Sequence, residues 1–408
     1  MPGSVLGNRS PLRRTPIPLT CDLPMSRDLL SWRDEFPILS RTTYLISNSL
    51  GAMPRGVPDA LNSYADDWAT EGVRSWETRG WFTLPIEVGD RIAPLIGAPA
   101  GSVSTHANVT LASAVVASCF DFSGPRNKIV CSSLNFPSIL YLYREQERHG
   151  AELHLVDSPD GIHVPIDELL EAIDERTALV PISHVIFKSA FIQDVEAVVR
   201  RAREVGAKVA LDVYQSTGAV EVDVSGWDVD FAVGGTLKWL CGGPGVAYLY
   251  VNPDLADSLE PALTGWMSHA KPFAFDPGPI DRNHGAWRFV NGTPAIAALR
   301  ACRPGLEILN QIGVDAIRAN SIRQTQRIID AADDNGWTVN TPRDASARGG
   351  TVSIMVPECE HVSRELLGRD ILIDFRPGAG IRLSPHFYTT DDEIDHAIAT
   401  IAELTGDG

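Results

Sequence analysis

Short apolar segments alternate with amphipathic ones between residues 101 and 251, and this rhythm constrains the fold more than any other feature of the chain. The runs 178–183 and 208–213 have the length of strands and few polar residues, which is typical of parallel strands buried on both faces. The segment 195–205 has the spacing of an amphipathic helix. We therefore predict an α/β fold with a mainly parallel sheet. Further strands are predicted at 128–131, 152–156, 231–233 and 246–251, and further helices at 111–120, 138–149 and 166–173.

The rhythm ends near residues 253–279, where prolines and aromatic residues are frequent. A long helical stretch is predicted over 294–332, and a smaller α+β domain follows from the patterns after it. These patterns predict strands at 351–356 and 381–384 and a last helix at 391–404. We expect three parts, namely a flexible tail over 1–20, an N-terminal segment with the large domain over 21–285, and a small C-terminal domain over 286–408.

The 408 residues include 35 basic and 52 acidic side chains, which give a formal net charge of −17. Such a surface repels phosphate backbones, so nucleic-acid binding is not expected. No apolar run approaches the roughly 18 residues that a membrane-spanning helix needs, and the start of the chain lacks the apolar core of a secretory signal. The six cysteines are scattered without a C-x-x-C pair, which predicts reduced thiols, a cytoplasmic location and no bound metal.

Two residues of opposite charge stand where ligands bind in such folds, beyond the carboxyl ends of the strands. Asp212 lies at the end of one predicted strand, and Lys238 follows the next strand 26 residues later. Glycines flank Lys238 within 234–245 and allow close approach to a planar ligand. A desolvated lysine loses its proton readily and can form a Schiff base with an aldehyde. The spacing alone favours a salt bridge or two solvated loop residues.

The segments 210–218 and 230–245 resemble the cofactor core of the class V enzymes that use pyridoxal phosphate (PLP). That group includes kynureninases, cysteine desulfurases, isopenicillin-type epimerases and some C–S lyases, and the likeness runs from about residue 44 to residue 404. The resemblance implies PLP fold type I, in which helices sandwich a mainly parallel sheet of the seven-stranded type. It also implies PLP as cofactor, an amino acid as substrate, and a homodimer with shared active sites.

The resemblance implies a role for each matching residue. Lys238 would hold PLP as a Schiff base and move protons at Cα and Cβ, and Asp212 would pair with the pyridinium nitrogen and keep the ring an electron acceptor. Gln215 matches a group that contacts the ring hydroxyl or the phosphate. Arg382 resembles the arginine that binds the substrate α-carboxylate as a planar fork, with Arg376 as its alternative. The other expected cofactor contacts are Val109, Thr110 and Thr236 at the phosphate, Phe136 stacked on the ring, and Trp266 and Thr293 reaching the site of the partner subunit.

Several of these residues also have an ordinary structural interpretation. Thr110 could be a plain helix cap, Phe136 a core side chain, and Trp266 interface packing. Arg382 could be a surface residue, although it begins an apolar strand after a Gly-rich loop. The candidate second bases are His106, His184, His269 and His386, of which the resemblance favours His106 and His269.

The chain departs from the best-known branches of the group. Kynureninases usually carry Tyr where Leu237 stands, Asp where Ile139 stands and His where Gln215 stands. Desulfurases that form a persulfide need a cysteine shortly before the carboxylate arginine, and the loop 376–382 has none. Two other cysteines, Cys241 and Cys359, could be considered as nucleophiles, and we expect both thiols to be unreactive.

A lyase is the predicted activity. Lys238 would remove the Cα proton and a group would leave from Cβ, by C–S or C–C cleavage, with release of a keto acid and ammonia. Kynureninase-like hydrolysis, transamination and epimerisation remain alternatives because they share the same core residues. A non-catalytic scaffold is disfavoured because Lys238 and Asp212 are both present, and a dinucleotide-binding oxidoreductase because no strand is followed by G-x-G-x-x-G.

Overall fold

A sheet of seven strands in the order β2-β8-β7-β6-β5-β3-β4 forms the centre of the fold. The computed structural model describes residues 28–406. Five strands run parallel to one another, namely β4, β3, β5, β6 and β7. Strand β8 pairs antiparallel with both β7 and β2. The predicted α/β fold with a mainly parallel sheet is therefore confirmed. The strands are β2 (Val103–His106), β3 (Lys128–Ser132), β4 (Glu152–Val156), β5 (Thr177–Ser183), β6 (Lys208–Asp212), β7 (Phe231–Gly235) and β8 (Ala247–Val251).

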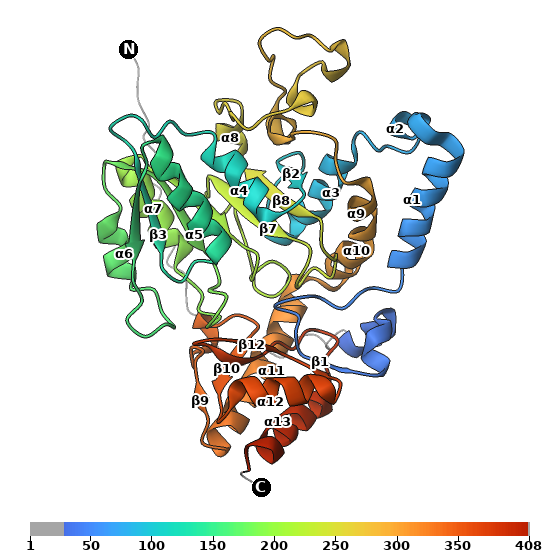
Figure 1. The fold of residues 1–408 in the computed structure, drawn as a ribbon, viewed down its shortest axis with the longest axis vertical. Helices are drawn as coiled ribbons and strands as arrows, with labels where there is room; N and C mark the ends of the chain where they lie inside the picture. Colours follow the sequence, from blue (N-terminus) through green and yellow to red (C-terminus); the bar gives the residue numbers. More distant parts are fainter. Residues whose placement is uncertain (1–27, 407–408) are drawn as a thin grey trace, which may run out of the picture.

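Helices cover both faces of this sheet (Figure 1). On β6, Val209 and Leu211 pack in the cluster that contains α6 and α7, whereas Ala210 packs with α4 and α5 on the other face. Successive side chains of a strand point to opposite faces, so a central strand such as β6 needs apolar residues on both sides, as its sequence pattern indicates. The helices are α4 (Val109–Ala117), α5 (Pro137–Arg144), α6 (Ile166–Ala172) and α7 (Val195–Val205).

A second, antiparallel sheet lies in the C-terminal part, in the order β12-β13-β10-β9. Helices α11, α12 and α13 pack on it around a separate cluster that includes Ile328, Leu366 and Ile398. This arrangement matches the predicted α+β character. The elements are β9 (Thr338–Val339), β10 (Val352–Met355), α12 (Cys359–Gly368), β12 (Asp374–Arg376), β13 (Gly380–Leu383) and α13 (Asp391–Thr405).

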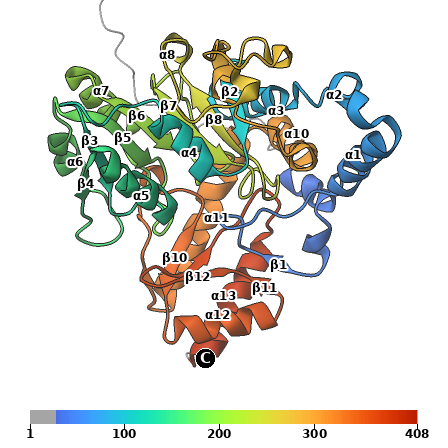
Figure 2. The ribbon, with the colours of Figure 1, turned by 45° about the horizontal axis from the view of Figure 1, so that its top comes forward.

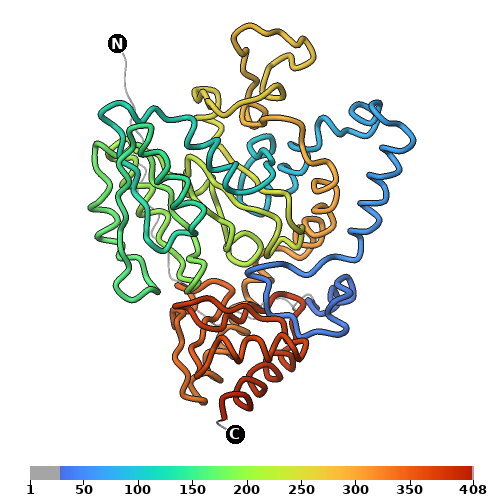
Figure 3. The backbone as a smooth tube through the Cα atoms, viewed as in Figure 1, coloured from blue at the N-terminus to red at the C-terminus, as the bar shows by residue number. Residues whose placement is uncertain are grey.

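The start of the described chain packs with its end. Strand β1 (Thr43–Tyr44) pairs in parallel with β11 (Ile371–Leu372), and Leu45 is buried in the C-terminal cluster. Figure 3 shows the N-terminal trace in blue running beside the red C-terminal part before it turns into α1. The sequence patterns did not predict this contact, because it joins short segments more than 300 residues apart.

The helical stretch predicted over 294–332 is three helices. Pro304 stands in the first turn of α10 and Gly313 has a φ of 86° before α11, and each residue favours a break. Leu299 and Leu309, which follow residue 286, pack in the core of the large sheet. The division at 286 stays a prediction, and the tail predicted over 1–20 lies outside the described residues. The helices are α9 (Ile296–Ala301), α10 (Arg303–Ile312) and α11 (Val314–Asp334).

Helices near the N-terminus, which the sequence patterns missed, close one end of the large sheet. Figure 2 shows α1, α3 and α10 together at this end, beside β2. Within residues 28–406, no helix has both the length and the apolar character needed to span a membrane. The remaining helices are α1 (Val57–Glu71), α2 (Ser75–Thr78), α3 (Leu84–Ile92) and α8 (Pro253–Ala256).

We predict that Gly89→Ala destabilises the protein. Gly89 is buried in α3, and a Cβ there would lie 2.0 Å from the carbonyl oxygen of Val103 in β2. Overpacking of this kind lowers the free energy of unfolding by about 1–3 kcal/mol, which thermal unfolding would detect as a lower midpoint. Gly368→Ala is the control, because nothing lies within 4 Å of a Cβ at that end of α12. Equal midpoints for the two variants would contradict the close α3–β2 packing.

Candidate active site

A cavity of about 250 Å³ lies at the carboxyl ends of β5, β6 and β7. It brings together six residues that the sequence singled out, from segments more than 100 residues apart. These are Val109, Thr110, Phe136, Asp212, Gln215 and Lys238. The other lining residues are Asn108, Ser138, Ser183, Val185, Phe187, Tyr214 and Leu237.

Asp212 is the buried anion of this cavity. It ends β6, and its Oδ1 accepts a hydrogen bond of 2.9 Å from the amide of Tyr214. Burial raises the pKa of its carboxyl, and the Tyr214 amide and the charge of Lys238 act in the opposite direction. No hydrogen bond to its Oδ2 occurs within the described chain, so one oxygen stays free for a ligand that can donate to it.

Lys238 is the buried cation. Its ammonium and Asp212 form no direct ion pair; the Nζ atom lies 4.4 Å from the ring centre of Tyr214 and 5.6 Å from that of Phe136. Burial lowers the pKa of Lys238 to about 8, although Asp212 acts to raise it. The salt-bridge and solvated-loop interpretations therefore both fail, and an amine of lowered pKa is of the chemical type that can act as a nucleophile.

The turn that carries Lys238 is fixed by close backbone packing. The amide of Gly51 donates to the Leu237 carbonyl at 2.9 Å, and a Cβ on Gly51 would lie only 2.1 Å from the carbonyl oxygen of Lys238. The Cys241 amide also donates to that oxygen at 3.0 Å. A segment near the N-terminus thus holds the lysine in place, and nothing in the local sequence of the lysine predicts it.

The first turn of α4 lines the cavity and can bind an anion. Asn108 is its N-cap, since its side chain accepts from the Leu111 amide at 3.0 Å, so Thr110 is not the cap. The amides of Val109 and Thr110 have no partner within the helix, and the helix dipole adds a partial positive charge. These features suit the phosphate that the sequence assigned to the two residues.

Gln215 links two segments beneath the cavity. Its Nε2 donates to the Asn48 carbonyl at 3.0 Å, and its Oε1 accepts from Trp239 Nε1 at 3.0 Å. One N–H and one lone pair remain for a ligand. These two hydrogen bonds fix the orientation of the Gln215 side-chain amide, so its remaining polar groups are held in place for a ligand.

Phe136 is exposed toward the cavity at the N-terminal end of α5, and it packs edge-on against Phe187 at 5.2 Å. The core interpretation of Phe136 does not hold, because a core ring would be buried. Tyr214 is one of the lining residues that sequence reasoning missed. An aromatic residue two positions after the strand-ending Asp212 was the available signal.

Thr236 does not line this cavity, contrary to expectation. It is fully buried, and its hydroxyl lies 3.2 Å from the Gly243 carbonyl and 3.3 Å from that of Val246, to which it donates. The Thr236 hydroxyl is thus bonded within the turn between β7 and β8.

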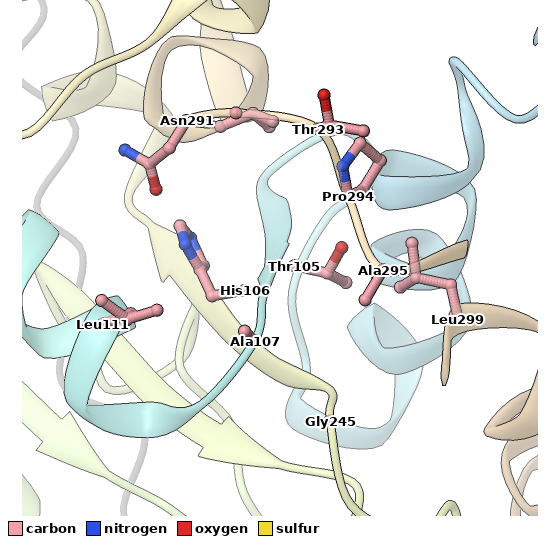
Figure 4. A pocket seen from close by; sticks show the side chains of 12 residues that line it. Thr105, His106, Ala107, Leu111, Gly245, Asn291, Thr293, Pro294, Ala295 and Leu299 are labelled. Carbon is pink, nitrogen blue, oxygen red and sulfur yellow. The ribbon is translucent and has the colours of Figure 1, made fainter. Parts of the chain in front are cut away.

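Trp266 and Thr293 also lie outside the Lys238 cavity. Trp266 packs against Phe82 and Phe273, with ring centres 6.2 and 5.8 Å apart. Thr293 lines a second cavity of about 250 Å³, where the His106 ring points toward Asn291 (Figure 4). The sequence predicts that both residues reach the active site of a partner subunit. Their absence from the cavity of their own chain is compatible with that prediction and does not test it.

Arg382 is buried, so it is not a surface residue. Its Nε and Nη2 donate to Asp374 Oδ1 at 2.9 and 2.7 Å, and its Nη1 donates to the carbonyl of Phe187, which lines the cavity. Arg382 is not among the residues that line the Lys238 cavity. A guanidinium has five N–H groups, so these three bonds leave two that could bind a carboxylate. Arg376 is more exposed and pairs with Asp374 Oδ2 at 2.9 Å.

None of the candidate histidines lines the Lys238 cavity. Burial lowers the pKa of His106, His184 and His386 to about 4, so all three are neutral near pH 7. The Nδ1 atom of His269 accepts a bond from the Lys271 amide. Lys238 is therefore the only one of the proposed bases in the cavity.

The two cysteines also lie outside the cavity. Burial raises the pKa of Cys241 to about 12, and the sulfur of Cys359 is bonded to the backbone of Val356. Among residues 28–406, no group of three or more His, Cys, Asp or Glu side chains could hold a metal ion.

We predict that aldehyde capture by Lys238 rises between about pH 7 and pH 9, with a midpoint near 8. Only the neutral amine attacks, and an ordinary lysine, with a pKa of 10.5, would be mostly protonated in that range. Borohydride trapping of PLP on the apo-protein, followed by mass spectrometry of the Lys238 peptide, measures capture. Asp212→Asn removes the charge that raises this pKa, so its midpoint should move to lower pH. A midpoint near 10.5 would contradict the burial of the amine.

The aminotransferase class-V family matches residues 43–396 of the chain. A kynureninase from Pseudomonas fluorescens is 33% identical over 387 residues, which cover 91% of each chain. A cysteine desulfurase from Thermococcus onnurineus NA1, solved in its apo form, has a TM-score of 0.82 at 21% identity and covers 93% of this chain and 98% of its own.

A cystine C–S lyase solved with its product, cysteine persulfide, has a TM-score of 0.80 at 18% identity and covers 90% of this chain and 99% of its own. At these identities the two solved structures support the fold alone. The family match spans most of the described residues and agrees with the resemblance found in the motifs. The chain is therefore an enzyme of the aminotransferase class-V family, whose cofactor is pyridoxal phosphate.

Proposed function

We propose that this enzyme cleaves a carbon–carbon bond hydrolytically in a kynurenine-like amino acid. The observation that carries the proposal is the similarity to kynureninases along nine-tenths of both chains, together with the meeting of Lys238, Asp212 and the α4 N-terminus in one cavity. The elimination predicted from the sequence becomes the second candidate, because this similarity supports hydrolysis better.

The cavity fits PLP in three independent features. A buried carboxylate, Asp212, has a free oxygen for the pyridinium N–H; the first turn of α4 offers free amides for the phosphate; and Lys238 offers an amine of lowered pKa for the aldehyde. These are the chemical types that the groups of PLP need. Phe136 adds an aromatic face beside the amine.

When bound, PLP supplies a ring that accepts the electron pair released at the substrate Cα. Lys238 holds the cofactor and then, as a free amine, takes the proton from Cα and can return it to Cα or Cβ. Asp212 keeps the ring nitrogen protonated. The apolar residues Val185, Phe187 and Leu237 line part of the cavity. Cleavage would consume one water molecule, whose oxygen would add to the carbonyl carbon next to Cβ as the bond between that carbon and Cβ breaks, and Lys238 would return a proton to Cβ.

Arg382 is proposed to bind the substrate α-carboxylate through its two unused N–H groups. Asp374 orients the guanidinium side-on, and the charge pair is buried, which strengthens both hydrogen bonds. The Phe187 carbonyl ties the same arginine to the cavity wall.

Elimination at Cβ remains the second candidate because of two side chains. Leu237 stands where kynureninases usually carry Tyr, and it presents an aliphatic group to the cavity. Ile139 stands where they carry Asp and is buried in the core beside α4. A hydrolase that relies on those polar groups would lack them here.

We further propose a cytoplasmic homodimer with shared active sites, in which the segments of Trp266 and Thr293 reach the site of the other subunit. Neither residue lines the Lys238 cavity of its own chain, and the exposed Phe273 packs against Trp266 and against the exposed Phe275. An exposed aromatic patch of this kind is typical of a protein contact.

Product analysis tests the choice between hydrolysis and elimination. The holoenzyme is incubated with kynurenine and, separately, with S-alkyl cysteines. Hydrolysis of kynurenine yields alanine and the aromatic acid in equal amounts, whereas elimination yields a keto acid and ammonia. We expect alanine and the aromatic acid from the original protein. The Lys238→Ala variant should form neither product and should lack the yellow colour of the bound cofactor. Keto acid and ammonia from a thioether, with kynurenine unchanged, would overturn hydrolysis in favour of elimination.

Arg382→Lys should raise KM for the amino-acid substrate roughly tenfold to a hundredfold, because one point charge replaces a fork of charge-assisted hydrogen bonds. Asp374→Asn should raise KM less, since it loosens the arginine without removing it. Steady-state kinetics measure both. Arg376→Gln is the matched control, as it removes an exposed partner of the same aspartate. A larger effect of Arg376→Gln than of Arg382→Lys would make Arg376 the carboxylate ligand.

A further inference from the structure

Tyr214 is the side chain in closest ring contact with the Lys238 amine. The Nζ atom lies 4.4 Å from the centre of the Tyr214 ring, against 5.6 Å for Phe136. At these distances a cation is attracted by the face of an aromatic ring. The two rings come from different elements, since Tyr214 follows β6 and Phe136 precedes α5.

The strand beside Tyr214 leaves room for its ring. A Cβ on Gly235 of β7 would lie 2.5 Å from the Cζ and Oη atoms of Tyr214, closer than any side chain permits. The ring therefore rests on the bare backbone of β7, with the amine of Lys238 near it. Any side chain at 235 would displace the Tyr214 ring from this position.

The backbone of Tyr214 is fixed by the cavity's own anion. Its amide donates to Asp212 Oδ1 at 2.9 Å, so the ring is positioned by the residue proposed to hold the cofactor nitrogen. Its hydroxyl has no hydrogen-bond partner within the described chain. Burial and the charge of Asp212 raise the pKa of this phenol to about 12, so it stays neutral near pH 7.

We infer that the ring of Tyr214 forms, with Phe136, an aromatic slot that holds the Lys238 nitrogen and the PLP ring attached to it. The inference rests on the proposed cofactor site and adds a residue to it. The aromatic face, rather than the hydroxyl, makes the contact, because the face is what meets the amine. Contact with that face also favours the positively charged form of the lysine nitrogen.

The test measures PLP binding by apo-protein, followed by the visible absorption of the cofactor, for Tyr214→Phe, Tyr214→Leu and Tyr214→Ala. Tyr214→Phe keeps the aromatic face and should bind PLP within about twofold of the original protein. Tyr214→Leu and Tyr214→Ala lose it and should bind roughly tenfold more weakly, the effect of one aromatic contact. In both, the pH at which the visible band changes should fall by about 0.5–1 unit, since a cation–π contact is lost.

Tyr248→Phe is the matched control. This buried tyrosine also occupies the space above a glycine of β7, Gly234, but its hydroxyl is bonded to Thr217 at 2.7 Å and it does not line the cavity. It should leave PLP affinity and the pH of the band change unaltered. Thermal unfolding of each apo variant separates a loss of cofactor contact from a loss of fold.

Two results would overturn the inference. If Tyr214→Leu binds PLP like the original protein, with the same band and pH profile, the ring only fills space. If Tyr214→Phe is as weak as Tyr214→Ala, the hydroxyl makes the contact. Failure of the proposed cofactor site is a separate outcome, because then the original protein also takes up no PLP through Lys238.

Discussion

Two opposite charges, Asp212 and Lys238, are buried at one edge of the large sheet without a direct ion pair between them. Burial without a partner disfavours the charged form of each group, and the pKa of the carboxyl is raised while that of the amine falls to about 8. Buried ionisable groups with shifted pKa values and no partner are typical of sites where a ligand supplies the missing contacts. The free oxygen of Asp212, the amine and the cavity around them are complementary to one planar molecule with a basic ring nitrogen and an aldehyde. The rest of the structure serves to keep these two groups apart and in place.

Close backbone packing provides that control. Strand β7 carries glycines at 234 and 235, and each leaves space that a tyrosine ring occupies, Tyr248 in one case and Tyr214 in the other. The turn after β7 is held from outside by Gly51, whose amide bonds to Leu237. A lysine on a free loop would turn toward water, whereas this one is confined between rings. In the sequence these glycines suggested space for a planar ligand. In the structure they also make space for aromatic rings of the protein itself.

The C-terminal part is coupled to the cavity through one buried network. Arg382 joins Asp374 in the small sheet to the Phe187 carbonyl in the cavity wall, and the Ser353 hydroxyl donates to the neighbouring Lys188 carbonyl at 2.6 Å. The connection between β5 and α7 is therefore held by both parts of the molecule. A carboxylate that binds the free end of Arg382 would add a third anchor to this network, which ties substrate recognition to the relative position of the two parts.

The sequence by itself determined the α/β class and the mainly parallel character of the sheet, and it predicted Asp212 and Lys238 as the centre of a cofactor site. The alternating segment 152–156 and the amphipathic segment 195–205 coincide with β4 and α7, because local periodicity follows directly from burial on one face. Only the tertiary structure decided which of the expected residues meet. The Thr236 hydroxyl bonds within the turn that follows β7, and Tyr214 lines the cavity. Strand β1 near the N-terminus pairs with β11 in the C-terminal part. The physical reason is that contacts between distant segments depend on packing in three dimensions, and no local pattern of residues encodes them.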